Sequence, residues 1–126
     1  MSGFTFDSNI LIDALGGSML AKAEIARGAA LGARVWISRM VWVEVMSKGS
    51  PQDMHRTEHF LSGFGVDEMD GEIGARAAAL RRERPRLKSP DAIILATAQL
   101  RNRLLVTRNT KEFPAEMPGI RVPYTF

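Results

Sequence analysis

The sequence predicts an α/β fold in which a mostly parallel central sheet carries helices on both faces, giving three layers. Short apolar runs of strand length alternate along the chain with longer helical patterns. Each helical segment then crosses from one strand to the next, and crossover connections of this kind make neighbouring strands parallel. The chain has 126 residues, 45% of them hydrophobic, with no repeat and no linker-like segment. We therefore expect residues 1–126 to form a single domain with one core.

The first strand and the two helices after it are predicted near the N-terminus. Residues 4–7 alternate apolar and polar side chains, which indicates a strand that ends at Asp7. A helix is expected to begin near Asn9. A glycine pair then interrupts the pattern, and Ser18 is a favourable cap for a helix from about residue 19 to residue 31.

A second strand and two further helices follow. Residues 35–37 form a compact apolar run of strand length. Residues 39–47 are apolar on almost every side, which is typical of a buried helix, and a Gly-Ser-Pro run at residues 49–51 ends it. Met54 and Leu61 mark one face of the next helix.

A helix near the middle of the chain has a clear start and a clear buried face. Asp70 is a favourable cap for it, and the helix is expected to end near Arg82. Its apolar stripe at Ile73, Ala77 and Leu80 has the spacing of one helix face. The acidic residues just before it, including Asp67, are expected to lie in a loop.

One more helix and two strands complete the predicted sheet. Ser89 at the cap and Pro90 at the first helical position form a favoured helix start. Residues 92–100 are apolar on nearly every side, so this helix should be central and buried. Residues 104–107 form a strand, and residues 120–122 form a shorter final one.

Composition excludes several classes of protein and of site. The absence of cysteine excludes disulfides, thiolate zinc sites and cysteine nucleophiles, and it fits a reducing compartment. The N-terminus has no basic region followed by a long apolar run, so no signal peptide is predicted. No segment approaches the roughly 20 apolar residues of a membrane span. We therefore expect a cytoplasmic protein with no membrane partner.

Positive charge is concentrated in the second half of the chain. Residues 1–75 carry 6 basic and 10 acidic side chains, whereas residues 76–112 carry 10 basic and 3 acidic ones. Such a concentration of cations attracts phosphate backbones. For the cluster over residues 81–88, the alternative is a solvated helix end whose cations complement the helix dipole.

Carboxylates and amides occur where the predicted strands end, which is the edge of a parallel sheet where binding sites form. They are Asp7 and Asn9 after the first strand, Glu44 in the helix after the second, Asp91 in the first turn of the buried helix, and Asn109 and Glu112 after the strand that ends at Thr107. Separate segments thus deliver carboxylates to one edge of the sheet.

A purely structural role is easier to assign to two of the central carboxylates than to the third. Asp91 is favoured by the dipole at a helix N-terminus, and Asp7 is suited to a turn or a cap. Glu44 is different, because it lies within the apolar run MVWVEVM and burial of a charge costs several kcal/mol without a partner. A divalent cation between the three would remove their mutual repulsion.

The chemistry of these ligands indicates the metal and the reaction. An all-oxygen ligand set selects a hard cation, Mg²⁺ or Mn²⁺, over zinc or copper. Such a site leaves positions for water and for a substrate phosphate. The sequence therefore predicts phosphodiester hydrolysis that needs no protein nucleophile.

Four segments occur in a fixed order along the chain: FTFDSNILID, VWVEVM, SPDAIILATA and LLVTRNTKEF. In order, spacing and overall length they resemble the PIN-domain ribonucleases, particularly VapC-type toxins of bacterial toxin–antitoxin pairs, and PGIRV resembles the family's last strand. The resemblance implies a PIN-like three-layer sandwich. It also implies a Mg²⁺-dependent endoribonuclease, with Mn²⁺ as a substitute, that acts on RNA, is inhibited by a cognate antitoxin and forms a homodimer.

The resemblance also implies roles for individual residues. Asp7, Glu44 and Asp91 match the three acidic metal-site positions of the family. Asn9 matches the polar partner beside the first of them, and Thr107 is expected to help position the substrate.

The fourth position of the family's site departs from the usual pattern. Many relatives have an aspartate where this chain reads NTKEF at residues 109–113. Asn109 is one candidate, as a neutral ligand or as a support for the ligands. Glu112 is the other, reaching the site with one extra methylene. Both alternatives stay open, as does the number of metal ions.

Other patterns favour structural interpretations. His55 and His59 belong to an H-x-x-E-H pattern typical of zinc peptidases, but a catalytic zinc needs a third protein ligand, and a solvated surface helix explains the pattern better. Trp36, Trp42 and Phe64 lie within apolar patterns, which favours core or dimer contacts over base stacking.

Two functions from different classes follow from these observations. The first is the metal-dependent endoribonuclease toxin. The alternative is a non-catalytic RNA-binding or interaction module in which the acidic cluster is vestigial. Glu44 discriminates between them, because a binding module gains nothing from a carboxylate in an apolar helix.

Overall fold

A five-stranded parallel sheet forms the centre of the computed structural model, which describes residues 3–30 and 35–126. The strands are β1 (Phe4–Phe6), β2 (Val35–Ser38), β3 (Gly65–Asp67), β4 (Leu104–Val106) and β5 (Ile120–Arg121). They lie in the order β3-β2-β1-β4-β5, and every neighbouring pair is parallel. The predicted α/β class with a mostly parallel sheet is confirmed.

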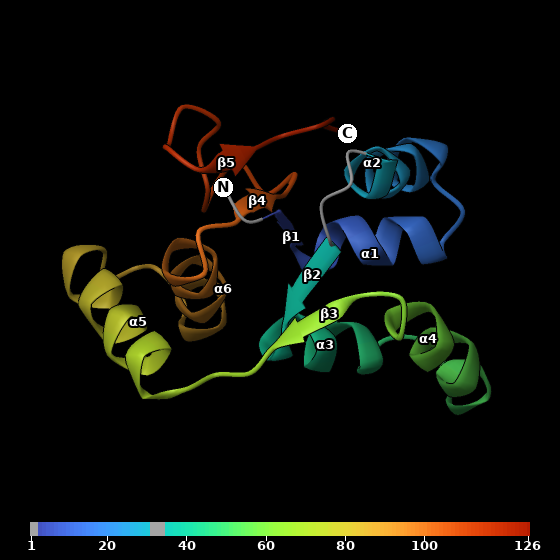
Figure 1. Cartoon of the computed structure of the whole chain (residues 1–126), viewed down its shortest axis with the longest axis horizontal. Helices are drawn as coiled ribbons and strands as arrows, with labels where there is room; N and C mark the ends of the chain where they lie inside the picture. The colour runs from blue at the N-terminus through green and yellow to red at the C-terminus, as the bar shows by residue number, and fades with distance from the viewer. Residues whose placement is uncertain (1–2, 31–34) are drawn as a thin grey trace.

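Helices cover both faces of this sheet (Figure 1). They are α1 (Ser8–Leu15), α2 (Met19–Ala30), α3 (Arg39–Met46), α4 (Met54–Leu61), α5 (Gly71–Glu83) and α6 (Ser89–Leu100), with a short 3₁₀ turn at Pro51–Asp53. In Figure 1, α5 and α6 lie on one side of the sheet and α1, α2 and α4 on the other. Helix α3 packs against both α1 and α6 at one edge.

The helix starts follow from local sequence. Asp70 accepts a hydrogen bond from the Ile73 amide at 2.9 Å and caps α5, as predicted. Ser38 caps α3 in the same way, through the Val41 amide at 3.1 Å. At α6 the prediction is wrong by one residue, because Lys88 is the cap and Ser89 is already helical. The predicted end of α2 at residue 31 lies outside the described residues.

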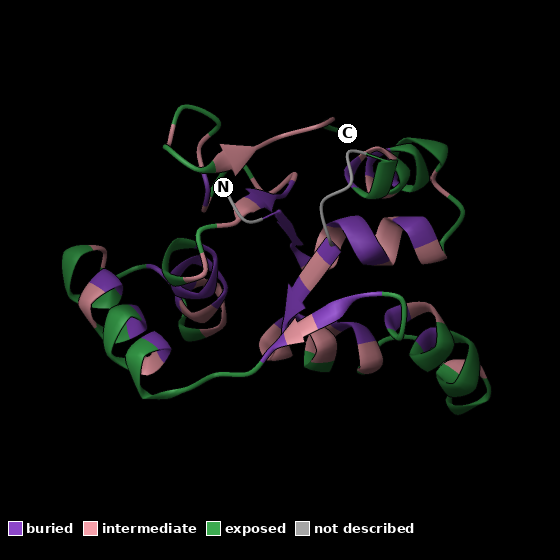
Figure 2. Cartoon of the chain, viewed as in Figure 1, coloured by how far each residue is buried: buried purple, intermediate pink, exposed green. Residues whose placement is uncertain are grey.

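The core runs along both faces of the sheet, as the buried segments of Figure 2 show. Helix α6 is the central buried helix that its apolar sequence predicts, with Ile94 and Leu95 almost fully covered. The stripe Ile73, Ala77, Leu80 is also buried and faces α6. Gly28 lets α2 approach the sheet closely, because a Cβ there would lie 3.3 Å from Val35 Cγ1.

Helix α3 is less buried than its sequence predicts. Val41 and Val45 are buried, but Val43 is 47% exposed and Glu44 is only half-buried. The reason is its position, because α3 lies at the edge where the strands end, so the part of the helix that carries Val43 has no element packed over it.

Strand β3 is absent from the sequence prediction, and its placement corrects the assignment of Asp67 to a loop. Gly65 and Asp67 are both disfavoured in strands. A Cβ at Gly65 would lie 2.6 Å from the Trp36 ring, so only glycine fits. The buried Asp67 carboxylate pairs with Arg103 at 3.0 Å, and the Arg103 guanidinium stacks 3.7 Å from the centre of the Trp36 ring. Long-range contacts thus stabilise a strand that local propensity disfavours.

Two ion pairs attach the C-terminal segment to the helices. The buried Glu24 carboxylate of α2 pairs with Arg121 of β5. Asp13 of α1 pairs with Arg108 at 2.6 Å and accepts a hydrogen bond from the Tyr124 hydroxyl at 2.8 Å. Over the parts of the chain that the structure describes, no helix has the length and apolar character needed to cross a bilayer.

Candidate active site

The candidate site lies where the strand order reverses. Strand β1 has β2 on one side and β4 on the other; α1 follows β1 on one face of the sheet, whereas α5 and α6 precede β4 on the other face. The carboxyl ends of such strands diverge into a crevice where α/β proteins bind ligands. Asp7 follows β1, and its amide donates to the Val106 carbonyl of β4 at 2.9 Å. This pairing places Asp7 and Thr107 side by side.

Asp7 is buried and held by three hydrogen bonds. It accepts from the Ser8 amide at 2.8 Å, from Thr107 Oγ1 at 2.7 Å and from Asn9 Nδ2 at 3.2 Å. Burial raises the pKa of Asp7, and these hydrogen bonds offset only part of that effect. The side chain is therefore held in one position at a high electrostatic cost.

Asn9 and Thr107 form the frame around this carboxylate. Asn9 Nδ2 also donates to Thr107 Oγ1 at 3.2 Å, and Asn9 Oδ1 accepts from the Arg108 amide at 3.2 Å. Thr107 Oγ1 in turn accepts from the Asn109 amide at 3.0 Å. The two residues link the start of α1 to the loop after β4.

Glu44 projects from α3 and has an unsatisfied oxygen. Its Oε1 atom is buried and has no hydrogen-bond partner among the described residues. Burial raises the pKa of Glu44, the Ser8 hydroxyl hydrogen-bonds to the carboxylate and lowers it, and the nearby Asp7 raises it again. Sequence reasoning missed Ser8, although its position directly after Asp7 at a helix start was a usable signal.

The other three carboxylates of the site all raise the pKa of Asp91. Asp91 lies in the first turn of α6 and is half-buried. Burial raises its pKa to about 6, and the negative charges of Asp7, Glu112 and Glu44 add to that effect, against a smaller opposing effect of Lys88. The four carboxylates therefore share one electrostatic environment.

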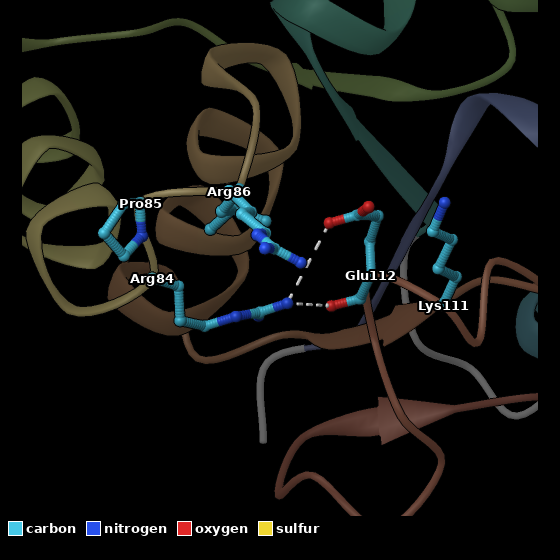
Figure 3. A pocket seen from close by; sticks show the side chains of 6 residues that line it. Arg84, Pro85, Arg86, Lys111 and Glu112 are labelled. Atoms are coloured by element: carbon cyan, nitrogen blue, oxygen red, sulfur yellow. Dashed lines mark hydrogen bonds and ion pairs between the residues drawn. The ribbon is translucent and has the colours of Figure 1, made fainter.

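The loop after β4 gives Asn109 and Glu112 different positions. Asn109 Oδ1 accepts from the Glu112 amide at 3.4 Å, so the Asn109 side chain shapes the loop. The Glu112 carbonyl accepts from Arg84 Nη2 at 2.7 Å, and Arg84 Nη2 lies 3.9 Å from the Glu112 carboxylate (Figure 3). The Glu112 carboxylate also contributes to the raised pKa of Asp91.

The predicted site residues thus come together to different degrees. Asn9 and Thr107 contact Asp7 directly, whereas Glu44, Asp91 and Glu112 act on one another through their charges. Over residues 3–30 and 35–126, no three His, Asp or Glu side chains are close enough to form a ready metal cluster.

The donor set fits a hard divalent cation. Three carboxylates, from the cap of α1, from α3 and from the loop after β4, act on Asp91 of α6, and Glu44 Oε1 lacks a partner among the described residues. A cation there would bind this oxygen, and its positive charge would oppose the effects that raise the pKa of Asp91.

The second metal-like pattern of the sequence lies elsewhere. His55 and His59 are both exposed on α4, as expected for a surface helix.

Ion pairs use part of the positive charge that the sequence concentrates in residues 76–112. Arg101 pairs with Asp70 at 2.6 Å, and Arg103 and Arg108 pair with Asp67 and Asp13. Carboxylates of the acidic half thus neutralise these three arginines, and the other cations of the stretch carry its excess of positive charge.

Comparisons with known proteins give the family and the fold. The family model of the PIN domain matches residues 4–115. A toxin–antitoxin complex from Klebsiella pneumoniae contains a chain with 43% identity and a TM-score of 0.87, over 98% of this chain and 99% of that chain. Comparison with curated proteins gave no match.

Two more distant solved structures share the fold. VapBC2 from Rickettsia felis, bound to a promoter DNA fragment, has 23% identity and a TM-score of 0.78 over 93% of this chain and 94% of that chain. DNA-bound VapBC from Salmonella typhimurium has 23% identity and a TM-score of 0.77 over 96% of both chains. The family model covers most of the chain and the fold agrees with it, so the chain belongs to the PIN-domain family.

Proposed function

We propose that this chain is the toxin of a toxin–antitoxin pair and acts as a metal-dependent endoribonuclease. One observation carries the proposal: three carboxylates from separate segments act on Asp91, and Glu44 Oε1 has no partner in the described part of the chain. Such an arrangement is costly for a structural or purely RNA-binding module. The similarity to a chain of the Klebsiella pneumoniae complex supports the toxin assignment.

The proposed ligands are Asp7, Glu44 and Asp91, with Glu112 as the fourth carboxylate. Mg²⁺ or Mn²⁺ held there would supply charge stabilisation at the phosphate and an activated water. Asn109 is not the ligand in this proposal, because its side-chain oxygen already accepts from the Glu112 amide.

The remaining residues position these ligands. Thr107 and Asn9 fix the Asp7 carboxylate through hydrogen bonds of 2.7 and 3.2 Å. Ser8 orients Glu44 from the first turn of α1. Arg84 holds the loop that carries Glu112. The chain thus presents oxygen ligands from rigid elements, which pre-organises the site.

Incubation of the purified chain with total RNA tests the function. We expect cleavage with Mg²⁺, loss of cleavage with EDTA and recovery with Mn²⁺. Undiminished cleavage in EDTA would contradict the metal dependence. Tight RNA binding without cleavage under any metal would favour the alternative, a non-catalytic RNA-binding module.

An apolar cavity supports the proposed antitoxin partner. A cavity of about 460 Å³ lies between α1, α2 and α4, with apolar walls and a basic rim. Its apolar walls come from Ala14, Leu15, Ile25, Ala26, Ala29 and Phe60. An apolar cavity of this kind suits an apolar side of a protein partner better than it suits RNA.

The partner proposal has its own test. The antitoxin encoded beside this chain should relieve toxicity on co-expression, and Ala26→Glu should abolish that relief while RNA cleavage in vitro continues. If the chain expressed alone leaves growth and cellular RNA intact, the toxin assignment is wrong even though the fold is right.

A homodimer, a cytoplasmic location and a single domain over residues 1–126 belong to the same proposal. Light scattering of the purified chain tests the dimer.

A further inference from the structure

Three cations and one carboxylate line one cavity beside the candidate active site. The cavity has a volume of about 490 Å³ and is lined by Arg84, Pro85, Arg86, Leu87, Lys111 and Glu112. In Figure 3, Arg84 of the α5–α6 connection points toward Glu112 of the loop after β4, and Arg86 and Lys111 lie on opposite sides of Glu112. Glu112 belongs to both the cavity and the acidic group, so the two adjoin.

The charges in this cavity differ from those elsewhere on the molecule. Most arginines contact carboxylates, as Arg103 does with Asp67 at 3.0 Å. Arg86 and Lys111 are exposed, and among the described residues neither side chain has an ion pair or hydrogen bond. Arg84 contacts Glu112, but its Nη1 atom has no acceptor in the same set of residues. The cavity therefore carries an excess of positive charge.

The backbone around this cavity is fixed by its own contacts. Leu87 is buried, its amide donates to the Arg84 carbonyl at 2.9 Å, and its carbonyl accepts from Arg81 Nε at 2.9 Å. On the other side, Phe113 is fully buried and anchors the loop that carries Lys111. The cations of the cavity project from two anchored segments.

A second cavity on the other side of the acidic group lacks this excess. It has a volume of about 530 Å³, and its lining includes Glu44, Lys48 and Arg108. Asp13 neutralises Arg108 at 2.6 Å, and Glu44 lies near enough to Lys48 for the Lys48 charge to lower the pKa of Glu44. With the Asp13–Arg108 pair counted, cations and carboxylates are equal in number there, whereas Arg84, Arg86 and Lys111 outnumber Glu112 in the first cavity.

We infer that the cavity between Arg86 and Lys111 binds a phosphodiester of a single-stranded RNA substrate next to the bond that is cleaved. This inference rests on the proposed function and names a binding site for its substrate. Phosphate contacts by arginine and lysine position a nucleic acid without reading its sequence. On the other side of the acidic group the charges balance, so the cleaved phosphate is expected at the acidic group and the neighbouring phosphate in the cavity at Arg86 and Lys111. The RNA strand then crosses the site in one defined direction.

Binding measurements on the full chain test the site without cleavage. A fluorescent single-stranded RNA is titrated in EDTA with the parent chain, with Arg86→Ala/Lys111→Ala and with the control Arg82→Ala. Arg82 is exposed on the same basic stretch but lines a different cavity with Ala78 and Arg81. We expect the double variant to bind about tenfold more weakly and its salt slope to fall by about 0.7, since the variant loses one single-strand phosphate contact. The control should change much less.

Neutral phosphates then locate the contact. Oligonucleotides with a single methylphosphonate at successive positions are cleaved by the parent chain with Mg²⁺. One position on one side of the cleaved bond should raise KM, and the same substitution should have no further effect in the double variant. This loss of coupling assigns that phosphate to the cavity.

The outcomes separate the two proposals. Cleavage with unchanged KM and salt slope in the double variant overturns the phosphate site and leaves the nuclease. RNA binding that depends on Arg86 and Lys111 without any cleavage supports the site and overturns the nuclease. Equal losses in the double variant and in Arg82→Ala overturn the site, because only general charge would then be acting.

Discussion

Replacement of Asp91 by Asn separates a role in metal binding from a role in stability. Asp91 accepts no hydrogen bond from the described residues, so the amide loses no contact. A pKa raised from 3.8 to about 6 corresponds to about 3 kcal/mol of destabilisation of the charged form above pH 6. Because Asp91 is half-buried, solvent screening reduces this to about 1–2 kcal/mol. The variant also loses the favourable interaction between the Asp91 charge and the α6 dipole. This loss destabilises it by about 0.3–1 kcal/mol and offsets part of the gain.

The expected net effect is a metal-free variant that is more stable by about 1 kcal/mol at pH 8, with a melting temperature higher by about 3–5 °C. RNA cleavage should fall at least about 100-fold, equivalent to about 2.7 kcal/mol of barrier, because the metal site is lost. The stabilisation of the wild type by added Mg²⁺ should also disappear.

Thermal melting and RNA cleavage are measured on the same preparation, without and with Mg²⁺. Glu58→Gln, at an exposed carboxylate of α4, is the matched control and should leave both quantities unchanged. A less stable Asp91→Asn protein that still cleaves RNA would refute the assignment, since that pattern belongs to a carboxylate that only stabilises a helix N-terminus.

Three further outcomes are expected from the same contacts. In EDTA, the stability advantage of Asp91→Asn over the wild type should grow as pH rises from about 4 to about 6 and level off above about 7. The reason is that the folded wild type still holds a proton that the unfolded carboxyl has released. A difference in urea midpoints that does not change with pH would contradict this. Thr107→Val should cost about 1–3 kcal/mol in urea unfolding because Asp7 loses its 2.7 Å donor, and Thr107→Ser should restore most of it. Gly65→Ala should cost about 1–3 kcal/mol because its Cβ would lie 2.6 Å from the Trp36 ring, whereas Gly74→Ala, with open space around it, should stabilise α5; equal effects would show that β3 is not packed as described.

Local patterns predict most of the secondary structure correctly. The alternation of short apolar runs with helical patterns gives the α/β class, and capping residues such as Asp70 fix helix starts to within one residue. The position of Asp7 at the end of β1 also follows from the sequence, because strand ends in a parallel sheet define its binding edge. These features depend on neighbours in the chain, which a sequence shows directly.

Contacts between distant segments decide the features that the sequence prediction misses. Strand β3 exists because Gly65 fits against Trp36 and Asp67 pairs with Arg103, and no local propensity reports such contacts. The exposure of α3 follows from its place at the sheet edge rather than from its apolar sequence.

The candidate site divides in the same way. The sequence by itself determines which residues carry carboxylates to the edge of the sheet, because strand and helix boundaries set their positions along the chain. Only the tertiary structure decides that Asn109 supports the loop while Glu112 acts on Asp91, and that Asp13 neutralises Arg108 while Arg86 and Lys111 stay unpaired among the described residues. Charge interactions depend on distance in space, and the fold sets those distances by bringing together residues about 100 positions apart in the chain, such as Asp7 and Thr107.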